Sequence, residues 1–391
     1  VNTRAVMQIE IIIPTIGGRE KYLRSCIESC LRQEGEFTVL VSNNGGAPGV
    51  RELVDALSNP RLRLVEPPVF LPMALHWEYA FSQARGDAIT FIGDDDALMP
   101  GAIARIQQLF AEHPSIECIA HQPGQYFWPD YLEGVWRNKY LVPPQSGRAT
   151  TKLTEPLLRQ VVEFRALYVV LPYLYHGFVR RTTLEGIRNA NGGLFRRAMP
   201  DVFTDLVLAS TLKEFLVTEE CLSLGGQGAK SNGANFLLNT ELGKDFLADL
   251  PDSLLPVHCP NSIYLQLQEY IASLPACAAL QQGGHPDWLH FTARVLVEAV
   301  QSKKHRKDIL EGLNRFAGQT FSPSTRFTAR GMTLLFGNAL VACTASGILR
   351  LRRRVNALRW KDASAEFGAT NIFDLTLALS KRLHKYGAVS E

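Results

Sequence analysis

Three adjacent carboxylates follow a short apolar run in this chain of 391 residues. Residues 88–92 are rich in β-branched and aromatic side chains, and they predict a buried strand of an α/β sheet. Asp94, Asp95 and Asp96 follow, and ligands of such sheets bind at the carboxyl ends of the strands. No basic residue lies inside the run, so a divalent cation with oxygen ligands best accounts for three acids at one strand end.

The acids have a simpler interpretation as an acidic turn before a helix that begins near Pro100. Acidic side chains favour helix N-termini because they interact with the helix dipole. This alternative stays open for the three aspartates alone. The pattern upstream of the strand weighs against it.

Apolar strands and helix-patterned segments alternate through the first hundred residues. This alternation predicts a parallel sheet of the nucleotide-binding type, whose strand ends meet at one edge. The acids after residue 93 would then lie beside the ends of the earlier strands. The expected strands are residues 8–15, 37–42 and 62–65, and the expected helices are residues 21–33, 50–57 and 73–84.

Composition excludes several classes of protein. Hydrophobic residues make up 46% and charged residues 20%, so the chain can bury a sizeable core. The net charge of +3 is too small to indicate a nucleic-acid partner. Seven scattered cysteines without a CxxC pair favour a reducing cytoplasm over a disulfide framework. Residues 1–7 do not have the pattern of a signal peptide.

Three landmarks in order carry a resemblance to a known family. They are Ile12–Thr15 after a first strand, Val41–Gly45 after a second, and Ile92–Pro100 with the three acids. Together they resemble the inverting glycosyltransferases of family 2, which have a GT-A fold with helices on both faces of the sheet. The resemblance covers about residues 8–235. It implies a nucleotide-diphosphate sugar donor, bound through Mn²⁺ or Mg²⁺.

The resemblance also assigns roles at the donor site. Pro14 and Thr15 would border the base and ribose, and Asp95 would face the ribose. Asp96 would bind the metal, with Asp94 supporting both neighbours. This is the family's DXD-type acidic motif.

Two further donor-site residues have alternative interpretations. Asn43 stands where the family commonly has an aspartate facing the base. Its amide accepts and donates, so it could pair with a uracil-like edge, or it could belong to a plain turn. Trp77 could stack on the nucleotide or pack in the core, and a core tryptophan is the more common case.

Asp201 and Asp205 lie one helical turn apart in a segment that Pro200 opens as a helix. An inverting transfer needs one general base, and a carboxylate here resembles the family's catalytic aspartate. Asp201 fits better because of its distance to the next expected strand at residues 215–217, and Asp205 stays an alternative. A simple helix cap is the third interpretation.

Three other segments are singled out. The aromatic and proline-rich residues 122–148 predict either a sugar-stacking wall or a hydrophobic flap packed on the sheet. Residues 224–233 predict a glycine-rich loop that could close over the pyrophosphate, with Lys230 as a cationic contact. Residues 331–349 are uncharged and flanked by arginines, which allows a buried, an interfacial or a spanning helix.

These patterns divide the chain into a GT-A domain, residues 1–235, and an α-helical region, residues 236–391, with possible contact to a membrane or a partner. The predicted function is a cytoplasmic, metal-dependent, inverting glycosyltransferase, in bacterial surface polysaccharide or glycan synthesis. Its acceptor would be a saccharide or a lipid-linked molecule, and the arginine-flanked segment allows a peripheral location of the protein on the inner face of the plasma membrane. The alternatives are a sugar-nucleotide pyrophosphorylase-like enzyme and a non-catalytic nucleotide-sugar-binding module.

Overall fold

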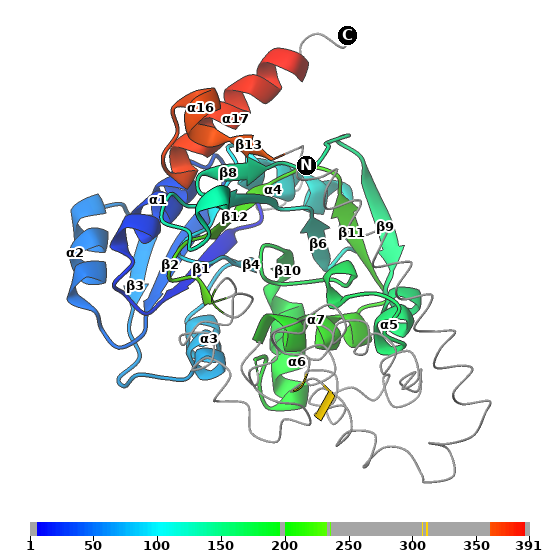
Figure 1. Ribbon diagram of the computed structural model, residues 1–391. Helices are drawn as coiled ribbons and strands as arrows, with labels where there is room; N and C mark the ends of the chain where they lie inside the picture. The colour runs from blue at the N-terminus through cyan, green and yellow to red at the C-terminus, as the bar shows by residue number, and fades with distance from the viewer. Residues whose placement is uncertain are drawn as a thin grey trace.

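A computed structural model gives the arrangement of the chain (Figure 1). The residues that it describes are 6–195, 200–232, 235, 307, 310, 311 and 360–387. Most of the predicted N-terminal part is therefore described, with only the end of the C-terminal region.

A mixed sheet of eight strands forms the centre of the described part of the chain, in the order β3-β2-β1-β4-β10-β6-β11-β9. The first four strands pair in parallel, as the sequence predicts. β10 runs antiparallel to both of its neighbours, and β9 runs antiparallel to β11. The strands are β1 (Ile9–Thr15), β2 (Phe37–Asn43), β3 (Leu62–Val65), β4 (Ala88–Phe91), β6 (Cys118–His121), β9 (Ala149–Leu153), β10 (Phe178–Arg180) and β11 (Glu214–Thr218).

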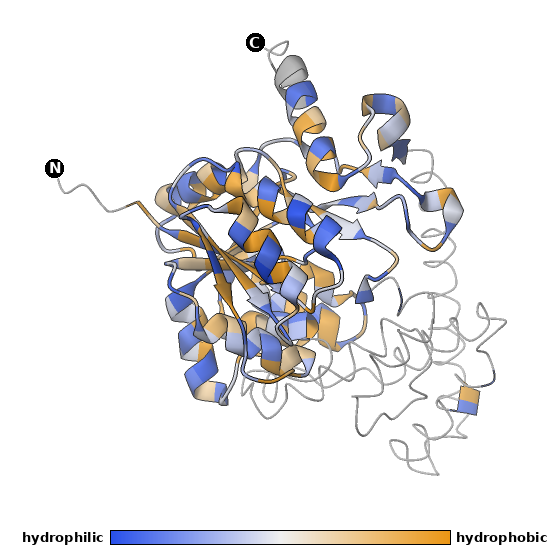
Figure 2. Ribbon diagram, turned by 90° about the vertical axis from the view of Figure 1, so that its left-hand side faces the viewer, coloured by the Kyte–Doolittle hydropathy of each residue, from blue (hydrophilic) through white to orange (hydrophobic). Residues whose placement is uncertain are grey.

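Helices cover both faces of this sheet, which confirms the predicted α/β class. Successive side chains of a strand point to opposite faces. Ile11 and Ile13 of β1 accordingly join one hydrophobic core with α1, α2 and α4, whereas Ile12 joins the other core with α3, α5, α6 and α7. The apolar central strands stand out in orange in Figure 2. The helices are α1 (Glu20–Leu31), α2 (Pro48–Leu57), α3 (Met73–Ser82), α4 (Ala102–Glu112), α5 (Thr154–Val162), α6 (Arg181–Asn191) and α7 (Pro200–Thr211).

A second, five-stranded sheet has the order β13-β8-β7-β12-β5. The aromatic residues 122–148 supply two of its strands and the short helix η1 (Gly134–Trp136). Tyr126, Trp128 and Tyr140 are buried, which favours packing over an exposed sugar-stacking wall. The strands are β5 (Ala97–Leu98), β7 (Gly124–Phe127), β8 (Lys139–Leu141), β12 (Ser223–Gln227) and β13 (Lys361–Asp362), and a second short helix, η2, spans Tyr168–Val170.

The glycine-rich residues 224–233 are a strand, not a loop, over their first half, because β12 extends to Gln227. A Cβ atom at Gly226 would lie only 1.8 Å from the carbonyl oxygen of Asp95. Trp128 donates its Nε1–H to the same oxygen at 3.0 Å. Gly226 therefore allows β12 to approach the acidic residues closely. From local composition alone, a glycine with this role cannot be distinguished from a glycine in a flexible loop.

The described C-terminal residues pack on the N-terminal part of the molecule, where Figure 1 shows them in red. β13 pairs with β8, α16 (Ala363–Phe367) follows it, and α17 (Ile372–Gly387) packs against α1 and β5. The rings of Trp360 and Phe127 lie 5.1 Å apart, and the Arg32 guanidinium lies 5.2 Å from the ring of Phe373. The helical character predicted for the C-terminal region is thus present where that region is described.

The uncharged residues 331–349 lie outside the described residues, and the predicted boundary at residue 235 stays a prediction. Within the described ranges, no helix is long and apolar enough to cross a bilayer.

Candidate active site

The three aspartates form a tight turn between β4 and β5, at the predicted carboxyl end of a buried strand. Their exposed fractions are only 2%, 6% and 1% for Asp94, Asp95 and Asp96. The Gly93 N–H donates to Asp96 Oδ2 at 2.6 Å and closes the turn. α4 begins later, at Ala102, and has no side-chain cap, so the acids do not serve as its cap.

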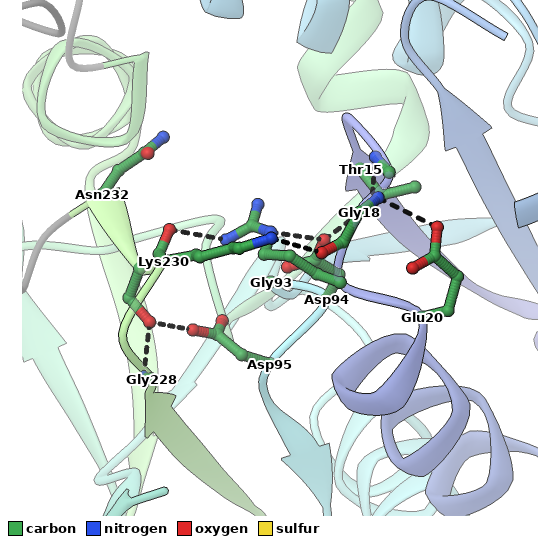
Figure 3. A network of polar contacts seen from close by, with 12 residues as sticks. Thr15, Gly18, Glu20, Gly93, Asp94, Asp95, Gly228, Lys230 and Asn232 are labelled. Carbon is green, nitrogen blue, oxygen red and sulfur yellow. Dashed lines mark hydrogen bonds and ion pairs between the residues drawn. The ribbon is translucent and has the colours of Figure 1, made fainter. Parts of the chain in front are cut away.

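Asp94 is paired with a cation from another loop. Its Oδ2 accepts the Thr15 hydroxyl at 2.6 Å and lies 3.2 Å from Nε of Arg19, in the loop after β1. Burial raises the pKa of Asp94, and the charge of Arg19 opposes that rise. Arg19 also donates to the Lys230 carbonyl at 3.1 Å, while Lys230 Nζ donates to the Gly18 carbonyl at 2.8 Å. These contacts join the loops after β1 and β12 above the acids (Figure 3).

Asp95 faces the segment that follows β12. Its Oδ2 accepts the hydroxyl of Ser231, which in turn accepts the Gly228 N–H at 2.7 Å. Burial, then the charges of Asp96 and Asp94, raises the pKa of Asp95 to about 8. Among the described residues, Asp95 therefore has one hydroxyl partner and no ion pair, and the charge of Arg19 opposes the rise of its pKa (Figure 3).

Asp96 is enclosed by hydrogen-bond donors. Its Oδ2 accepts the hydroxyl of Tyr175 at 2.6 Å and lies 3.2 Å from Nε2 of His176, and its Oδ1 accepts the Gly226 N–H at 2.7 Å. Burial alone would raise the pKa of Asp96, but the contacts with His176, Tyr175 and Gly226 lower it. Asp96 is the one acid of the turn that these surroundings favour as a carboxylate.

The resemblance implies a divalent ion at Asp96, where both carboxylate oxygens accept hydrogen bonds in this structure. In the described ranges, no three His, Cys, Asp or Glu side chains gather as a metal cluster. Mg²⁺-type sites, however, commonly use one or two protein ligands and take the rest from water and phosphate. A Cβ at the partly exposed Gly225 would lie 4.0 Å from Asp96 Oδ1, an ordinary contact distance, so β12 passes close beside this carboxylate.

The two candidate bases lie at the start of α7. Asp201 is partly exposed, whereas Asp205 is buried and accepts the Leu174 N–H, and none of the described residues donates a hydrogen bond to its Oδ1. Burial raises the pKa of both carboxyls. The charge of Asp201 also acts on Tyr175, whose pKa is raised first by burial and then by Asp96, Asp95 and Asp201. Through the Leu174 N–H, α7 also contacts the segment that carries Tyr175, whose hydroxyl donates to Asp96.

The predicted donor-site residues lie at the ends of β1 and β2. Pro14 is partly exposed, and Thr15 is buried against Asp94. The buried Asn43 side chain bonds both the N–H and the carbonyl of Ala47, at 3.2 and 3.1 Å, and donates to Glu66 Oε1 at 2.7 Å. These bonds stabilise the turn after β2. They favour the interpretation of Asn43 as a turn residue, and its predicted contact with the base stays a prediction.

Trp77 lies in the hydrophobic core under the site. Its ring stacks with Phe91 and Tyr175 at centroid distances of 5.1 and 5.8 Å, and its exposed fraction is 8%. Trp77 therefore packs directly against Tyr175, the residue whose hydroxyl donates to Asp96. Its predicted contact with the nucleotide stays a prediction.

A comparison with family models gives one match to this part of the chain. The model described as glycosyl transferase family 2 matches residues 10–155, from β1 into α5, and this span contains the acidic turn. Residues 10–155 belong to glycosyl transferase family 2. The family 2 region includes the predicted donor-site residues, and it ends before the candidate bases on α7.

Individual proteins resemble the chain more weakly. An uncharacterized protein of Mycobacterium tuberculosis is 28% identical over 122 residues, which are 30% of this chain and 36% of that protein. The chain thus spans about a third of the length of this curated relative. Residues 1–349 of S. aureus TarS are 15% identical, with 81% of this chain and 93% of that chain covered, at a TM-score of 0.45. Their complex with UDP-GlcNAc is 14% identical at the same coverage, with a TM-score of 0.46.

Sequence reasoning missed the partners of the acids in the family 2 region. Arg19 follows two glycines after β1, and the sequence gives no sign that it pairs with Asp94, 75 positions away. Tyr175, His176 and Ser231 lie outside the matched residues, 79 or more positions from the acids that they contact. The sequence shows His176 shortly before β10, and a lone histidine indicates no particular partner.

Proposed function

We propose that the chain is a metal-dependent, inverting glycosyltransferase that moves a sugar from a nucleotide-diphosphate sugar to an acceptor hydroxyl. The family 2 region supports the reaction class. Metal dependence, inversion and the roles of individual residues belong to the proposal.

The observation that carries the proposal is that Tyr175 is linked both to the acidic turn and to α7. Its hydroxyl donates to Asp96, and the charge of Asp201 on α7 contributes to the raised pKa of Tyr175. The acid proposed to hold the metal and the acid proposed as the base thus act on one side chain. A single-displacement transfer needs this combination, because the leaving diphosphate and the attacking hydroxyl lie on opposite sides of the anomeric carbon.

In the proposed reaction, Asp201 accepts the proton of the acceptor hydroxyl as its oxygen bonds to the anomeric carbon. The bond from that carbon to the diphosphate oxygen breaks, and the nucleoside diphosphate leaves with the electron pair. Burial raises the pKa of Asp201, which makes its carboxylate a stronger base once it is ionised. The divalent ion, Mn²⁺ or Mg²⁺ held by Asp96, would offset the charge on the leaving diphosphate.

The chain's own residues also orient the donor in this proposal. Thr15 fixes Asp94 at the end of β1, and Asp95 faces the glycine-rich segment, where Ser231 holds it. The base and ribose would lie over Pro14 and the turn that Asn43 stabilises. Lys230, an exposed cation beside this loop, would contact the pyrophosphate.

The proposal also includes an acceptor and a cellular setting. We assign a saccharide or lipid-linked acceptor, in surface polysaccharide or glycan synthesis, and no nucleic-acid partner. Cys26, Cys30, Cys118 and Cys221 are buried free thiols, which supports a reducing cytoplasm. Peripheral contact with the plasma membrane rests on the arginine-flanked residues 331–349, outside the described residues.

The test is a transfer assay with purified protein, Mn²⁺, a panel of nucleotide sugars including UDP-GlcNAc, and saccharide and lipid-linked acceptors. We expect release of a nucleoside diphosphate together with a product whose anomeric configuration, read by NMR, is opposite to that of the donor. Retained configuration would contradict inversion. Formation of a sugar phosphate and a nucleoside triphosphate from added pyrophosphate would favour the pyrophosphorylase, and donor binding without any product would favour a binding module.

A further inference from the structure

The second sheet carries an aromatic cluster on the face that points away from its buried core. Alternate residues of a strand point to opposite faces, so the burial of Tyr126 leaves Phe127 on the other face, where it is partly exposed. The ring centroid of Phe127 lies 5.7 Å from that of Trp136 on η1 and 5.1 Å from that of Trp360, next to β13. Trp136 and Trp360 are also partly exposed, with ring centroids 5.5 Å apart. We call these three residues the aromatic platform.

We propose that the aromatic platform binds the sugar rings of the acceptor, and that the acceptor is therefore a saccharide of more than one ring. The face of an aromatic ring is negatively polarised, so the C–H groups on one face of a sugar ring pack favourably on it. This inference rests on the proposed function only for the identification of the bound saccharide as the acceptor.

The platform lies on the same face of the sheet as the residues beside the acidic turn. Phe127 is paired in register with Gln227 on β12, and Gly225 precedes Gln227 by two residues and so shares its face. A Cβ at Gly225 would lie 3.7 Å from His176 Nε2 and 4.0 Å from Asp96 Oδ1. A strand advances about 7 Å over two residues. A saccharide on the platform can therefore extend its next ring toward the proposed donor site.

Amide groups accompany the aromatic rings on this face. Gln125 is exposed on β7, two residues before Phe127, and Gln227 is partly exposed on β12. An amide both donates and accepts hydrogen bonds, which suits the hydroxyl groups at the rim of a sugar ring. Small-molecule sites typically combine aromatic and apolar walls with a few polar groups that fix the orientation of the ligand.

The charges around the platform favour a neutral saccharide over an anionic bilayer. Lys139 and Asp362 pair with each other at 2.9 Å, and the exposed Glu133 and Arg137 lie on either side of η1. These four residues together contribute no net charge. An anionic membrane surface attracts clusters of Lys and Arg, and these residues do not form such a cluster.

Hydrogen bonds connect the platform to the acidic turn and to its own support. Trp128 follows Phe127 and donates its Nε1–H to the Asp95 carbonyl at 3.0 Å. The ring of Tyr131 lies 4.5 Å from that of Phe127, and Arg137 donates its Nε–H to the Tyr131 carbonyl at 2.8 Å. A site that is already ordered avoids the cost of ordering its side chains when a ligand binds.

Isothermal calorimetry of the full chain without donor tests the proposal, with neutral gluco-, galacto-, manno- and N-acetylglucosamine oligosaccharides of increasing length. We expect binding that strengthens from one ring to three. Trp136→Leu and Trp360→Leu keep apolar bulk but remove the ring, and each should weaken binding about tenfold. Trp136→Phe and Trp360→Phe keep a ring and should stay within about threefold of the wild-type protein.

The matched control is Val135→Ser, which changes an exposed apolar side chain on η1 without altering a ring. It should leave the saccharide affinity unchanged. Absence of binding to the whole series would overturn the inference, as would equal losses in the Leu and Phe variants, which would assign the rings to packing alone. Binding to phosphatidylglycerol vesicles that Val135→Ser weakens, without binding to saccharides, would assign this surface to a membrane instead.

Kinetics separate this inference from the proposed function. For a saccharide that is glycosylated, Trp360→Leu should raise the acceptor KM about tenfold while kcat and the donor affinity are retained. Transfer with an unchanged acceptor KM would overturn the inference and leave the proposed function intact. Ring-dependent saccharide binding by a chain that transfers no sugar would contradict the function and support the saccharide site.

Discussion

The acidic turn after β4 and the start of α7 each contain a buried aspartate, but the two side chains have opposite environments. Asp96 in the turn is surrounded by donors, and its pKa is lowered. Asp205 on α7 has, within the part of the chain that the structure describes, one backbone donor and one oxygen without a partner, and its pKa is raised. The same residue type is therefore kept ionised in one region and pushed toward its neutral form in the other.

This difference suits the two carboxylates to different functions, cation binding and proton transfer. A carboxylate that stays ionised inside the protein can hold a cation, because the protein has already offset the cost of its burial. A carboxylate with a raised pKa holds a proton more firmly and so can accept one during a reaction. Asp201 lies between these extremes, since its pKa is raised but it is partly exposed.

The largest expected effect is at Asp96. Asp96→Ala should abolish Mn²⁺-dependent binding of the nucleoside diphosphate, because it removes a proposed direct ligand from a site with few protein ligands. Isothermal calorimetry with Mn²⁺ and a panel of nucleoside diphosphates measures this. Asp55→Ala, an exposed acid on α2, is the matched control and should bind normally. Unchanged affinity in Asp96→Ala would remove the metal assignment and the contrast between the regions.

The second effect concerns the base. Asp201→Asn should keep the fold and the donor affinity but lose turnover on the order of 10²-fold or more, the usual scale of acid–base assistance. Steady-state rates with donor affinity measured in parallel provide the test. If Asp201→Asn is silent and Asp205→Asn is inactive, the role of base passes to Asp205.

The third prediction concerns charge balance in the turn. Arg19→Gln removes the cation beside the buried Asp94 and should lower the free energy of unfolding by about 3 kcal/mol, since an uncompensated buried charge remains. Urea denaturation measures the loss. Arg24→Gln, on the exposed side of α1 with Glu28 3.7 Å away, should change stability by less than about 0.5 kcal/mol.

A double variant makes the third test specific. If Arg19 mainly offsets the charge of Asp94, then Asp94→Asn should cancel much of the loss caused by Arg19→Gln. Simple addition of the two effects would show that Arg19 stabilises the loops through Lys230 and not through Asp94.

Local pattern was sufficient to predict the elements that hold the site. Short apolar runs predict β1, β2 and β4, and the acids after β4 mark the carboxyl edge of the sheet. These features depend on neighbours in the sequence. The helix that begins at Pro200 was predictable for the same reason, because a proline and an acid mark a helix start.

The partners of the acids were not predictable because they depend on the tertiary fold. Arg19, Tyr175 and Ser231 contact the turn from three different segments. Nothing in one sequence specifies which distant hydroxyl or guanidinium completes a buried carboxylate. The strand β12 shows the same limit, since the glycines that allow it to approach Asp95 resemble the glycines of a flexible loop.

The smallest effect concerns the buried acid of α7. Burial, then the charge of Asp201, raises the folded-state pKa of Asp205 above its unfolded value. For an acid this means that folding favours the protonated form, so stability is lost as pH rises above the unfolded pKa. Asp205→Asn has the shape of the neutral acid and should raise the free energy of unfolding at neutral pH, on the order of 1 kcal/mol.

Urea denaturation at pH 4 and pH 8 decides this last prediction. The variant should gain most over the wild-type protein at the higher pH, where the wild-type protein pays to keep Asp205 neutral or to bury its charge. Turnover should fall far less than in Asp201→Asn. A variant that is less stable at both values would mean that Asp205 is a satisfied carboxylate like Asp96, and the contrast between the acidic turn and α7 would then rest on Asp201 alone.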